Sequence, residues 1–184
     1  MGSALRLTRA YILGAMHDGT FHASTIRISQ REKPYVVMIQ NLILTMGGKA
    51  WVYREGRRRR LYVVEFSRSF MRGLQIRSRR DRIDYARGYF DAEGGIPSVG
   101  WHEPYLYFAQ KNRSDLAQLR IILLDLGISC GEIHNPSRRA DPDYWRFYVG
   151  RRSIRTFAKV VGSWHPRKAF LLSRIAGETQ GAAH

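Results

Sequence analysis

Residues 86–94 read ARGYFDAEG and residues 11–19 read YILGAMHDG, and these two stretches decide the fold of the chain. Each has glycine and alanine along one face of a helix, and each ends in an acidic residue followed by glycine. Small residues on one face let helices approach closely, so we expect the two stretches to pack against each other as helices. Their terminal acids, Asp18 and Glu93, would then lie side by side, and the glycine after each acid suits a left-handed helix end.

The segments that follow these stretches repeat each other with an offset of 80 residues. Residues 28–33, ISQREK, lead into residues 34–46, and residues 108–113, FAQKNR, lead into residues 114–126. Each copy reads as an alternating strand with glutamine at its end, a polar turn, and a helix with apolar periodicity that stops at glycine.

Further strand-like runs and closing helical segments complete each copy. They are expected at residues 49–54, 61–66 and 69–75 in the first copy, and at residues 128–134, 144–149, 154–161 and 168–176 in the second. We therefore predict an α+β protein with internal pseudo-twofold symmetry. It consists of two αββαββα repeats with antiparallel sheets, residues 1–78 and 79–184.

The composition points to a polyanionic partner. The chain has 31 Lys and Arg residues against 15 Asp and Glu residues, a net charge of +16, and 26 of the basic residues are Arg. The excess is +12 in residues 1–80 and +4 in residues 81–184. A hydrophobic content of 44% is ample for a packed core, so a disordered basic tail is excluded and nucleic acid is the expected partner.

Cysteine content and hydropathy exclude other classes of protein. The single Cys130 rules out an internal disulfide framework and a cysteine-based zinc site. No stretch approaches the ~18 consecutive apolar residues of a membrane span, and residues 1–9 lack an apolar signal core. We expect a cytoplasmic, nucleoid-associated protein with no membrane partner.

The paired glycine–acid stretches, in register with the repeated strand–glutamine–helix unit, resemble the LAGLIDADG homing endonucleases over nearly the whole chain. Gly88 and Gly94 have the family spacing, whereas Gly14 lies one residue nearer its acid than the family pattern has it. The resemblance is greatest to single-chain, two-motif members carried in archaeal ribosomal-RNA introns. It implies two motif helices at the centre, with antiparallel sheets that form a DNA-binding saddle.

Phosphodiester cleavage needs metal-held water and neutralisation of charge on the phosphate, and Mg²⁺ or another hard divalent cation prefers carboxylate and water ligands. Asp18 and Glu93, with the adjoining Gly19 and Gly94, are the candidate metal ligands. Two converging carboxylates repel each other, and a shared cation relieves that repulsion. Asp91 is a rival of Glu93, but it takes the place of the inner Asp of the family motif and we interpret it as structural.

Further active-site residues are implied by the resemblance. Its active-site glutamine maps onto Gln30 and Gln110, and by the alternation of each strand both would end the row that faces the core. The family also uses basic residues near the phosphate. Lys168 and Arg80 are the first candidates, with rivals and further candidates at Arg79, His165, Arg167, Lys33 and Lys111. His17, next to Asp18, could be a metal ligand, but a structural or solvated histidine is more expected.

The strand faces opposite the core are suited to reading DNA, because a two-stranded ribbon fits the major groove, where Arg binds guanine. The expected DNA-binding residues are Thr25, Arg27, Ser29, Arg31, Lys33, Arg54, Arg57, Arg58, Arg59, Arg60, Tyr105, Tyr107, Lys111, Arg113, Arg138 and Arg139. The run of four arginines from Arg57 is as typical of a solvated hairpin tip as of a phosphate-binding loop. Trp51, Trp101 and Trp145 are expected in the core.

These observations favour a Mg²⁺-dependent endonuclease that cuts double-stranded DNA at a long site. Because the two halves differ in sequence, the site should be non-palindromic, and because one chain carries both halves, a monomer is expected. Intron RNA is a further candidate partner. The alternatives are an RNA-splicing maturase or a non-cleaving DNA-binding regulator on the same scaffold. The ordered repeat disfavours a basic ribosomal protein.

Overall fold

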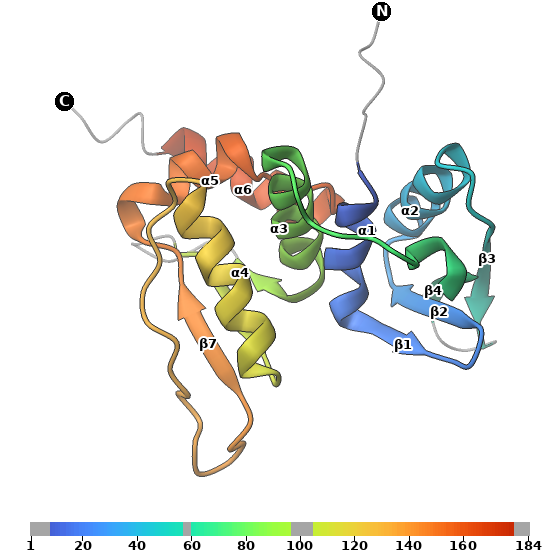
Figure 1. Cartoon of the computed structure of the whole chain (residues 1–184). Helices are drawn as coiled ribbons and strands as arrows, with labels where there is room; N and C mark the ends of the chain where they lie inside the picture. Colours follow the sequence, from blue (N-terminus) through green and yellow to red (C-terminus); the bar gives the residue numbers. More distant parts are fainter. Residues whose placement is uncertain (1–7, 57–59, 97–104, 179–184) are drawn as a thin grey trace, which may run out of the picture. The chain divides into compact units, whose positions relative to one another are not determined.

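The computed structural model describes residues 8–56, 60–96 and 105–178 of the chain. By its internal contacts the chain divides into two compact units, Met1–Ala92 and Glu93–His184 (Figure 1). Both contain helices and an antiparallel sheet, so the predicted α+β class is confirmed. In the described residues, no helix combines the length and the apolar character needed to cross a membrane.

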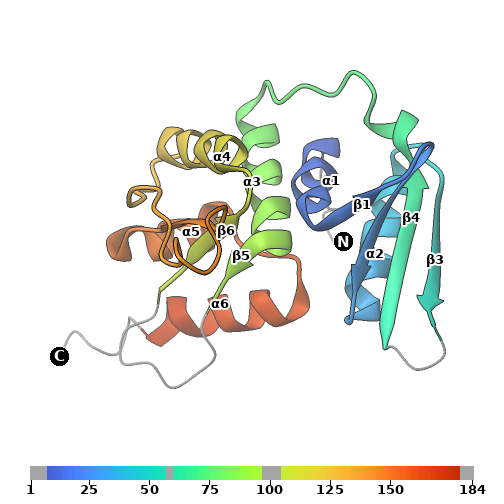
Figure 2. The ribbon, with the colours of Figure 1, turned by 90° about the horizontal axis from the view of Figure 1, so that it is seen from below.

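The first unit has a four-stranded antiparallel sheet with a helix on one face. Its helices are α1 (Arg9–Ala15), α2 (Lys33–Thr45) and nearly all of α3 (Arg79–Glu93), and its 3₁₀ turns are η1 (Met16–Asp18) and η2 (Arg68–Met71). Its strands are β1 (Gly19–Phe21), β2 (Thr25–Gln30), β3 (Ala50–Glu55) and β4 (Leu61–Ser67), in the order β1–β2–β4–β3. Figure 2 shows α2 lying along this sheet.

The second unit repeats this plan with a smaller sheet. Its strands are β5 (Gly94–Gly95), β6 (Tyr107–Gln110) and β7 (Trp145–Tyr148), in the order β5–β6–β7. Its helices are α4 (Arg113–Asp125), α5 (Ile154–Val160) and α6 (Pro166–Glu178), and the 3₁₀ turn η3 (Arg151–Ser153) precedes α5. Helix α4 lies along β6 and β7 (Figure 1).

Strand alternation determines which side chains enter each core. On β2, Ile26 and Ile28 are buried while the residues between them are half-exposed, as the period of two requires. The core-facing residues of β4 and α2 complete the first core, among them Val64, Phe66, Val36, Ile39 and Ile43. In the second unit, Phe108 stacks on Phe147 with ring centroids 5.2 Å apart, against Leu116, Leu119 and Leu123 of α4.

The central helices end as the sequence predicts. Gly47 follows α2 with φ +79°, and Gly127 follows α4 with φ +80°. Both are left-handed helix ends, which glycine adopts at little cost. The Asn112 side chain accepts hydrogen bonds from the N–H groups of Ser114 and Asp115, and so caps the start of α4.

Two expected elements are shorter in the structure. The strand predicted over residues 128–134 survives as two isolated bridges, Cys130–Val149 and His134–Arg146. Between these bridges the register slips by one residue, so the segment contains a bulge that interrupts the ladder. The helical segment predicted over residues 69–75 is reduced to the 3₁₀ turn η2.

Helices α1 and α3 pack through glycine, as expected. A Cβ atom placed on Gly14 would lie 2.2 Å from the carbonyl oxygen of Tyr85, and one on Gly88 would lie 2.0 Å from that of Tyr11. Both distances are far inside van der Waals contact, and the opposing atoms belong to helix backbones that cannot move aside. The approach of these helices therefore requires glycine at both positions.

Candidate active site and nucleic-acid interface

The acid of each motif lies at the end of its helix. Asp18 is the last residue of the 3₁₀ turn that follows α1, and Glu93 is the last residue of α3. From Gly14 to Asp18 the chain takes one α-helical step and three 3₁₀ steps, whereas Gly88 to Glu93 is five α-helical steps. With rises of about 1.5 and 2.0 Å per residue, both paths advance by about 7.5 Å. The 3₁₀ turn therefore compensates for the residue that the first motif lacks.

The glycine after each acid does not form a left-handed helix end, so this expectation is wrong. Gly19 has φ −98° and begins β1, and Gly94 begins β5. A Cβ atom on Gly19 would lie 2.8 Å from the carbonyl oxygen of Met16. Glycine is needed here for close approach of the backbone as the helical turn passes directly into a strand.

The short strands after the acids fix the position of the glutamines. Gly19 pairs with Ile28, and Gly94 pairs with Phe108. In both units the glutamine lies two residues beyond that partner, so its side chain is carried back to the acid. The amide of Gln30 donates to Asp18 Oδ2 at 2.7 Å, and the amide of Gln110 donates to Glu93 Oε1 at 3.3 Å. The same acid–glutamine pair therefore occurs twice, built by the same register.

The donor set at each acid suits a hard divalent cation. Asp18 is exposed and Glu93 is half-exposed, so their carboxylate oxygens are accessible. Among the described residues no three His, Cys, Asp or Glu side chains form a group able to hold a metal ion. One carboxylate per unit fits Mg²⁺, which commonly binds one or two carboxylates and completes its shell with phosphate and water.

His17 and Asp91 have structural surroundings, as the sequence led us to expect. The centroid of the His17 ring lies 4.0 Å from that of the Tyr89 ring, and its Nε2 forms a 3.0 Å hydrogen bond with the Tyr85 hydroxyl. Asp91 is 1% exposed and accepts a 2.6 Å hydrogen bond from the Tyr11 hydroxyl, which also lies 3.1 Å from that of Tyr35. Burial, followed by the negative charge of Asp91, raises the pKa of both tyrosines well above their ordinary value.

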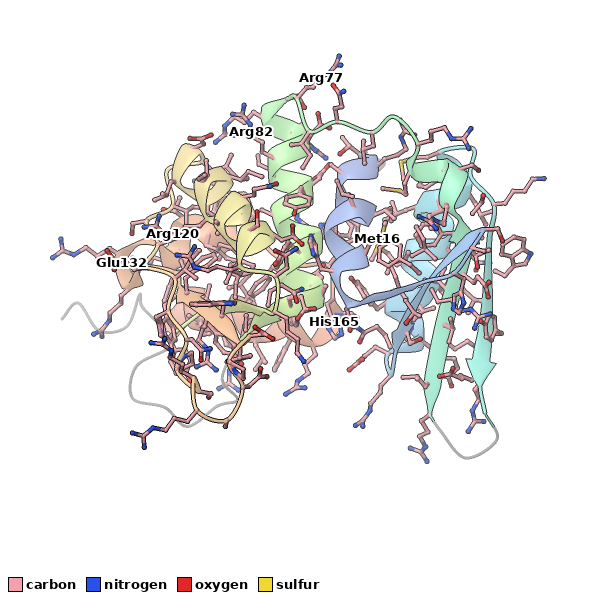
Figure 3. The ribbon with its side chains drawn as sticks, turned by 60° about the horizontal axis from the view of Figure 1, so that its bottom comes forward. Met16, Arg77, Arg82, Arg120, Glu132 and His165 are labelled. Atoms are coloured by element: carbon pink, nitrogen blue, oxygen red, sulfur yellow. The ribbon has the colours of Figure 1, made fainter. Side chains whose placement is uncertain are left out.

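Arg80 does not lie near the acids, which corrects the role predicted for it. It is the second residue of α3, about 20 Å along the helix from Glu93 at about 1.5 Å per residue. Its Nε binds the buried carboxylate of Asp84 at 3.2 Å, which also accepts the Thr8 N–H at 2.8 Å. Figure 3 shows Arg77 and Arg82 at this same amino-terminal end of α3. Arg80 therefore belongs to the cluster that holds the start of α1.

The other basic candidate lies in the second unit. Lys168 is half-buried in the first turn of α6, and Arg167 beside it is exposed. His165 is 5% exposed in the segment that leads into α6 (Figure 3). The role predicted for Lys168 at the scissile phosphate stays a prediction.

The outer face of the first sheet carries a hydrogen-bonded cluster around Glu65 on β4. Its carboxylate accepts hydrogen bonds from Thr25 Oγ1 at 2.7 Å, Tyr53 OH at 2.8 Å and Arg27 Nε at 2.9 Å. The hydrogen bond from Thr25 has the largest effect on the pKa of Glu65 and lowers it; partial burial raises it, and Tyr53 and Arg27 lower it further, so that the net pKa is below its usual value. Sequence reasoning predicted Thr25 and Arg27 for this face but missed Glu65 and Tyr53.

Trp51 lies on this outer face and not in the core, so its predicted position is wrong. It pairs across the sheet with Glu65 and is 52% exposed. Trp145 is half-buried, with the Arg113 guanidinium 5.3 Å from the centre of its ring. Trp101 lies outside the described residues.

The outer face of the second sheet carries tyrosines around Arg146 on β7. The guanidinium lies 4.6 Å from the centre of the Tyr107 ring, and it donates to Tyr144 OH at 2.7 Å and Tyr148 OH at 3.0 Å. Burial by itself lowers the pKa of Arg146. The hydrogen bonds to Tyr144 and Tyr148 raise it and outweigh burial, so the net pKa is above its ordinary value. Tyr105 and Tyr107 were predicted here; Arg146 was missed, although the alternation of Tyr144, Arg146 and Tyr148 is its signal.

Most of the remaining predicted DNA-binding residues are solvent-exposed. These are Arg31, Lys33, Arg54, Arg60, Lys111, Arg113, Arg138 and Arg139, and Ser29 is half-exposed on the outer face of β2. Lys33 begins α2, and the N–H of Lys111 donates to Gln110 Oε1 at 2.7 Å. Arg57, Arg58 and Arg59 lie outside the described residues.

Comparisons with known proteins agree with this architecture. Residues 81–162 match the family model of a LAGLIDADG-like domain. The crystal structure of I-DmoI in complex with DNA and Mn aligns with a TM-score of 0.63 and 18% identity, over 83% of this chain and 94% of that chain. A structure of mesophilic variants of the homing endonuclease I-DmoI aligns with a TM-score of 0.65 and 19% identity, over 90% of this chain and 96% of that chain.

The same architecture occurs in a second group of proteins. Full-length DUF199/WhiA from Thermatoga maritima aligns with a TM-score of 0.65 and 20% identity, over 92% of this chain and 59% of that chain. No curated protein sequence matches the chain. The chain thus has the LAGLIDADG fold, and its residues 81–162 match the model of that domain.

Proposed function

We propose that this protein is a site-specific endonuclease that cuts both strands of a long, non-palindromic DNA site with Mg²⁺ or another hard divalent cation. The observation that carries the proposal is the acid–glutamine pair, which occurs in both units with the same register and the same hydrogen bond. A protein that only holds DNA has no need of an accessible carboxylate in each half of a strongly basic chain.

Asp18 and Glu93 would hold the cations, with Gly19 and Gly94 beside them, and the cation supplies water activation and charge neutralisation at the scissile phosphate. Gln30 and Gln110 orient the carboxylates through their amide hydrogen bonds. Their second role is to position water at the phosphate. Lys168 is the candidate for neutralising developing negative charge.

DNA binding would use the outer faces of the two sheets together with the exposed arginines. The first face has the ion pair between Arg27 and Glu65, and the second has tyrosines around Arg146. Two faces of different chemistry recognise two different half-sites, which favours a non-palindromic target. Structures of I-DmoI with this fold contain DNA and Mn or Ca, in keeping with a DNA partner and a divalent cation.

The test is cleavage of linear duplex DNA by the purified wild-type chain. The substrate is the uninterrupted host-gene junction if the gene lies in an intron, as an archaeal ribosomal-RNA intron would provide, and otherwise a duplex selected from a random library. We expect one double-strand cut with Mg²⁺ and none with EDTA, by one chain per duplex. Specific binding without any cut would overturn the nuclease, and binding to precursor RNA in its place would favour a maturase.

A further inference from the structure

Glu65 is an acidic residue in the middle of a face that we propose binds DNA. It pairs across the sheet with Arg27 on one side and with Trp51 on the other. A carboxylate in that place repels phosphate, so its presence needs an explanation. It accepts hydrogen bonds from two residues of β2 and one of β3, and thereby uses three of about four acceptor positions within the protein.

The contact with Glu65 leaves the end of Arg27 available. Only Nε of the Arg27 guanidinium is bonded to the carboxylate, and the Arg27 side chain is 39% exposed. Within the described part of the chain, the two terminal amino groups of Arg27 make no hydrogen bond. Those two groups are the donors that bind O6 and N7 of guanine in the major groove.

Arg146 provides the contrast within the same molecule. Both of its terminal amino groups donate to tyrosine hydroxyls, so its fork is occupied by the protein. The strand registers place Val63 at the position that corresponds to Arg146, and Tyr148 at the position that corresponds to Glu65. The two sheets therefore present arginine in two different states.

We propose that Arg27 reads a guanine in the half-site bound by the first unit, and that Glu65 is a positioning residue that fixes the direction of its guanidinium. This inference rests on the proposed DNA-binding function. A phosphate contact is disfavoured because the ion pair has no net charge and Glu65 repels phosphate. A base edge suits the pair, since a fixed fork makes two parallel bonds with little loss of side-chain freedom.

The proposal predicts a particular pattern of variant behaviour. Arg27→Ala should lose preference for guanine at one base pair, by about 5- to 150-fold. Glu65→Ala should weaken the preference at that same base pair, yet bind unrelated duplexes more tightly because a negative charge is removed. Glu65→Gln keeps an acceptor oxygen for Arg27, so it should retain part of the preference. A purely structural role for Glu65 would instead weaken binding to all sequences alike.

The experiment uses a library of duplexes randomised over about 24 base pairs. The duplexes bound by the wild type and by each variant are selected and sequenced. Arg60→Ala is the control, because an exposed arginine at a phosphate should lower affinity uniformly. Thermal melting of each variant establishes that it is folded. Failure of the wild type to enrich any sequence would refute DNA recognition itself. Enrichment by the wild type, with the Arg27→Ala profile unchanged or the Glu65→Ala change at a different base pair, would overturn this inference alone.

Discussion

At the residue scale, the two acids at the end of α3 have different surroundings although only Ala92 separates them. Glu93 is accessible and bonded to Gln110, whereas Asp91 is buried and accepts the hydroxyl of Tyr11. The Tyr11 hydroxyl also lies 3.1 Å from that of Tyr35 on α2, so this network connects α1, α2 and α3. These surroundings favour the proposed metal-binding role for Glu93 and a structural role for Asp91.

Replacing Asp91 should destabilise the first unit. Asp91→Ala leaves the buried Tyr11 hydroxyl without its acceptor and opens a cavity, so we expect the free energy of unfolding to fall by about 2–4 kcal/mol. Guanidinium denaturation measures this loss, with Tyr11→Phe as the milder control at about 1 kcal/mol. A change in Asp91→Ala smaller than that of the control would show that the network contributes little.

The same tyrosines predict a loss of stability in alkali. Their pKa is raised in the folded protein, so the folded state retains protons that the unfolded state releases above about pH 10. Their contribution is complete below that pH and is lost as pH rises further. We expect the free energy of unfolding to fall less between pH 8 and pH 10.5 for Tyr11→Phe than for the wild type, as denaturation at both pH values would measure. An equal fall in both proteins would contradict the assignment.

At the scale of elements, the packing of α1 on α3 depends on two glycines. The Cβ of Gly14→Ala or Gly88→Ala would overlap backbone carbonyl oxygens, so each should lower the free energy of unfolding by about 2 kcal/mol or more, despite alanine's better helix propensity. Gly177→Ala in α6 is the matched control, because its Cβ meets nothing within 4 Å. That variant should be as stable as the wild type or more stable by up to about 1 kcal/mol. Thermal and chemical denaturation decide the point, and equal behaviour of all three variants would refute it.

The sequence predicted elements wherever one local pattern is sufficient. The alternation of Ile26 and Ile28 placed Gln30 on the core-facing row, and Gly47 and Gly127 ended the central helices as expected. The offset of 80 residues related Gln30 to Gln110 and the helix after each of them. These features depend only on periodicities of about 2 and 3.6 residues and on the freedom of glycine.

What the sequence could not predict depends on register and on close approach in three dimensions. Trp51 is exposed because β3 pairs with β4 so that Trp51 faces Glu65, and an aromatic residue in a strand gives no sign of its face. Arg80 is charged and near a motif, but twelve residues of helix lie between it and Glu93. Gly19 is needed for proximity to Met16 and not for a helix end, two requirements that look alike in a sequence.

At the scale of the whole molecule, the charge of +16 predicts strongly salt-dependent DNA binding. Each phosphate contact releases counterions, so the slope of log affinity against log salt should be steep, about −0.9 per contact. Replacing Arg60 or Arg54 with alanine should make the slope shallower by about one unit each without changing the preferred sequence. Fluorescence anisotropy at salt concentrations between about 50 and 200 mM measures this slope. Over that range a protein with several phosphate contacts loses affinity by about 10³-fold or more. A wild-type slope near zero would contradict binding through the phosphate backbone.

The difference between the two units has a consequence for the target. The first has Arg27 and Glu65 at its centre and most of the positive charge, and the second has tyrosines around Arg146. The repeated acid–glutamine pair is common to both. In the nuclease that we propose, recognition would be asymmetric while the chemistry is repeated, which is the combination that a double-strand cut in a non-palindromic site needs.

The most direct test of this account is cleavage of the recognised duplex by Asp18→Asn and Glu93→Gln beside the wild type, with binding measured in parallel. These changes keep the size of the side chains and remove the charge that would hold the cation. We expect each variant to bind the duplex as the wild type does and to make no double-strand cut with Mg²⁺. Double-strand cleavage that persists in both variants would contradict the central role of the two acids.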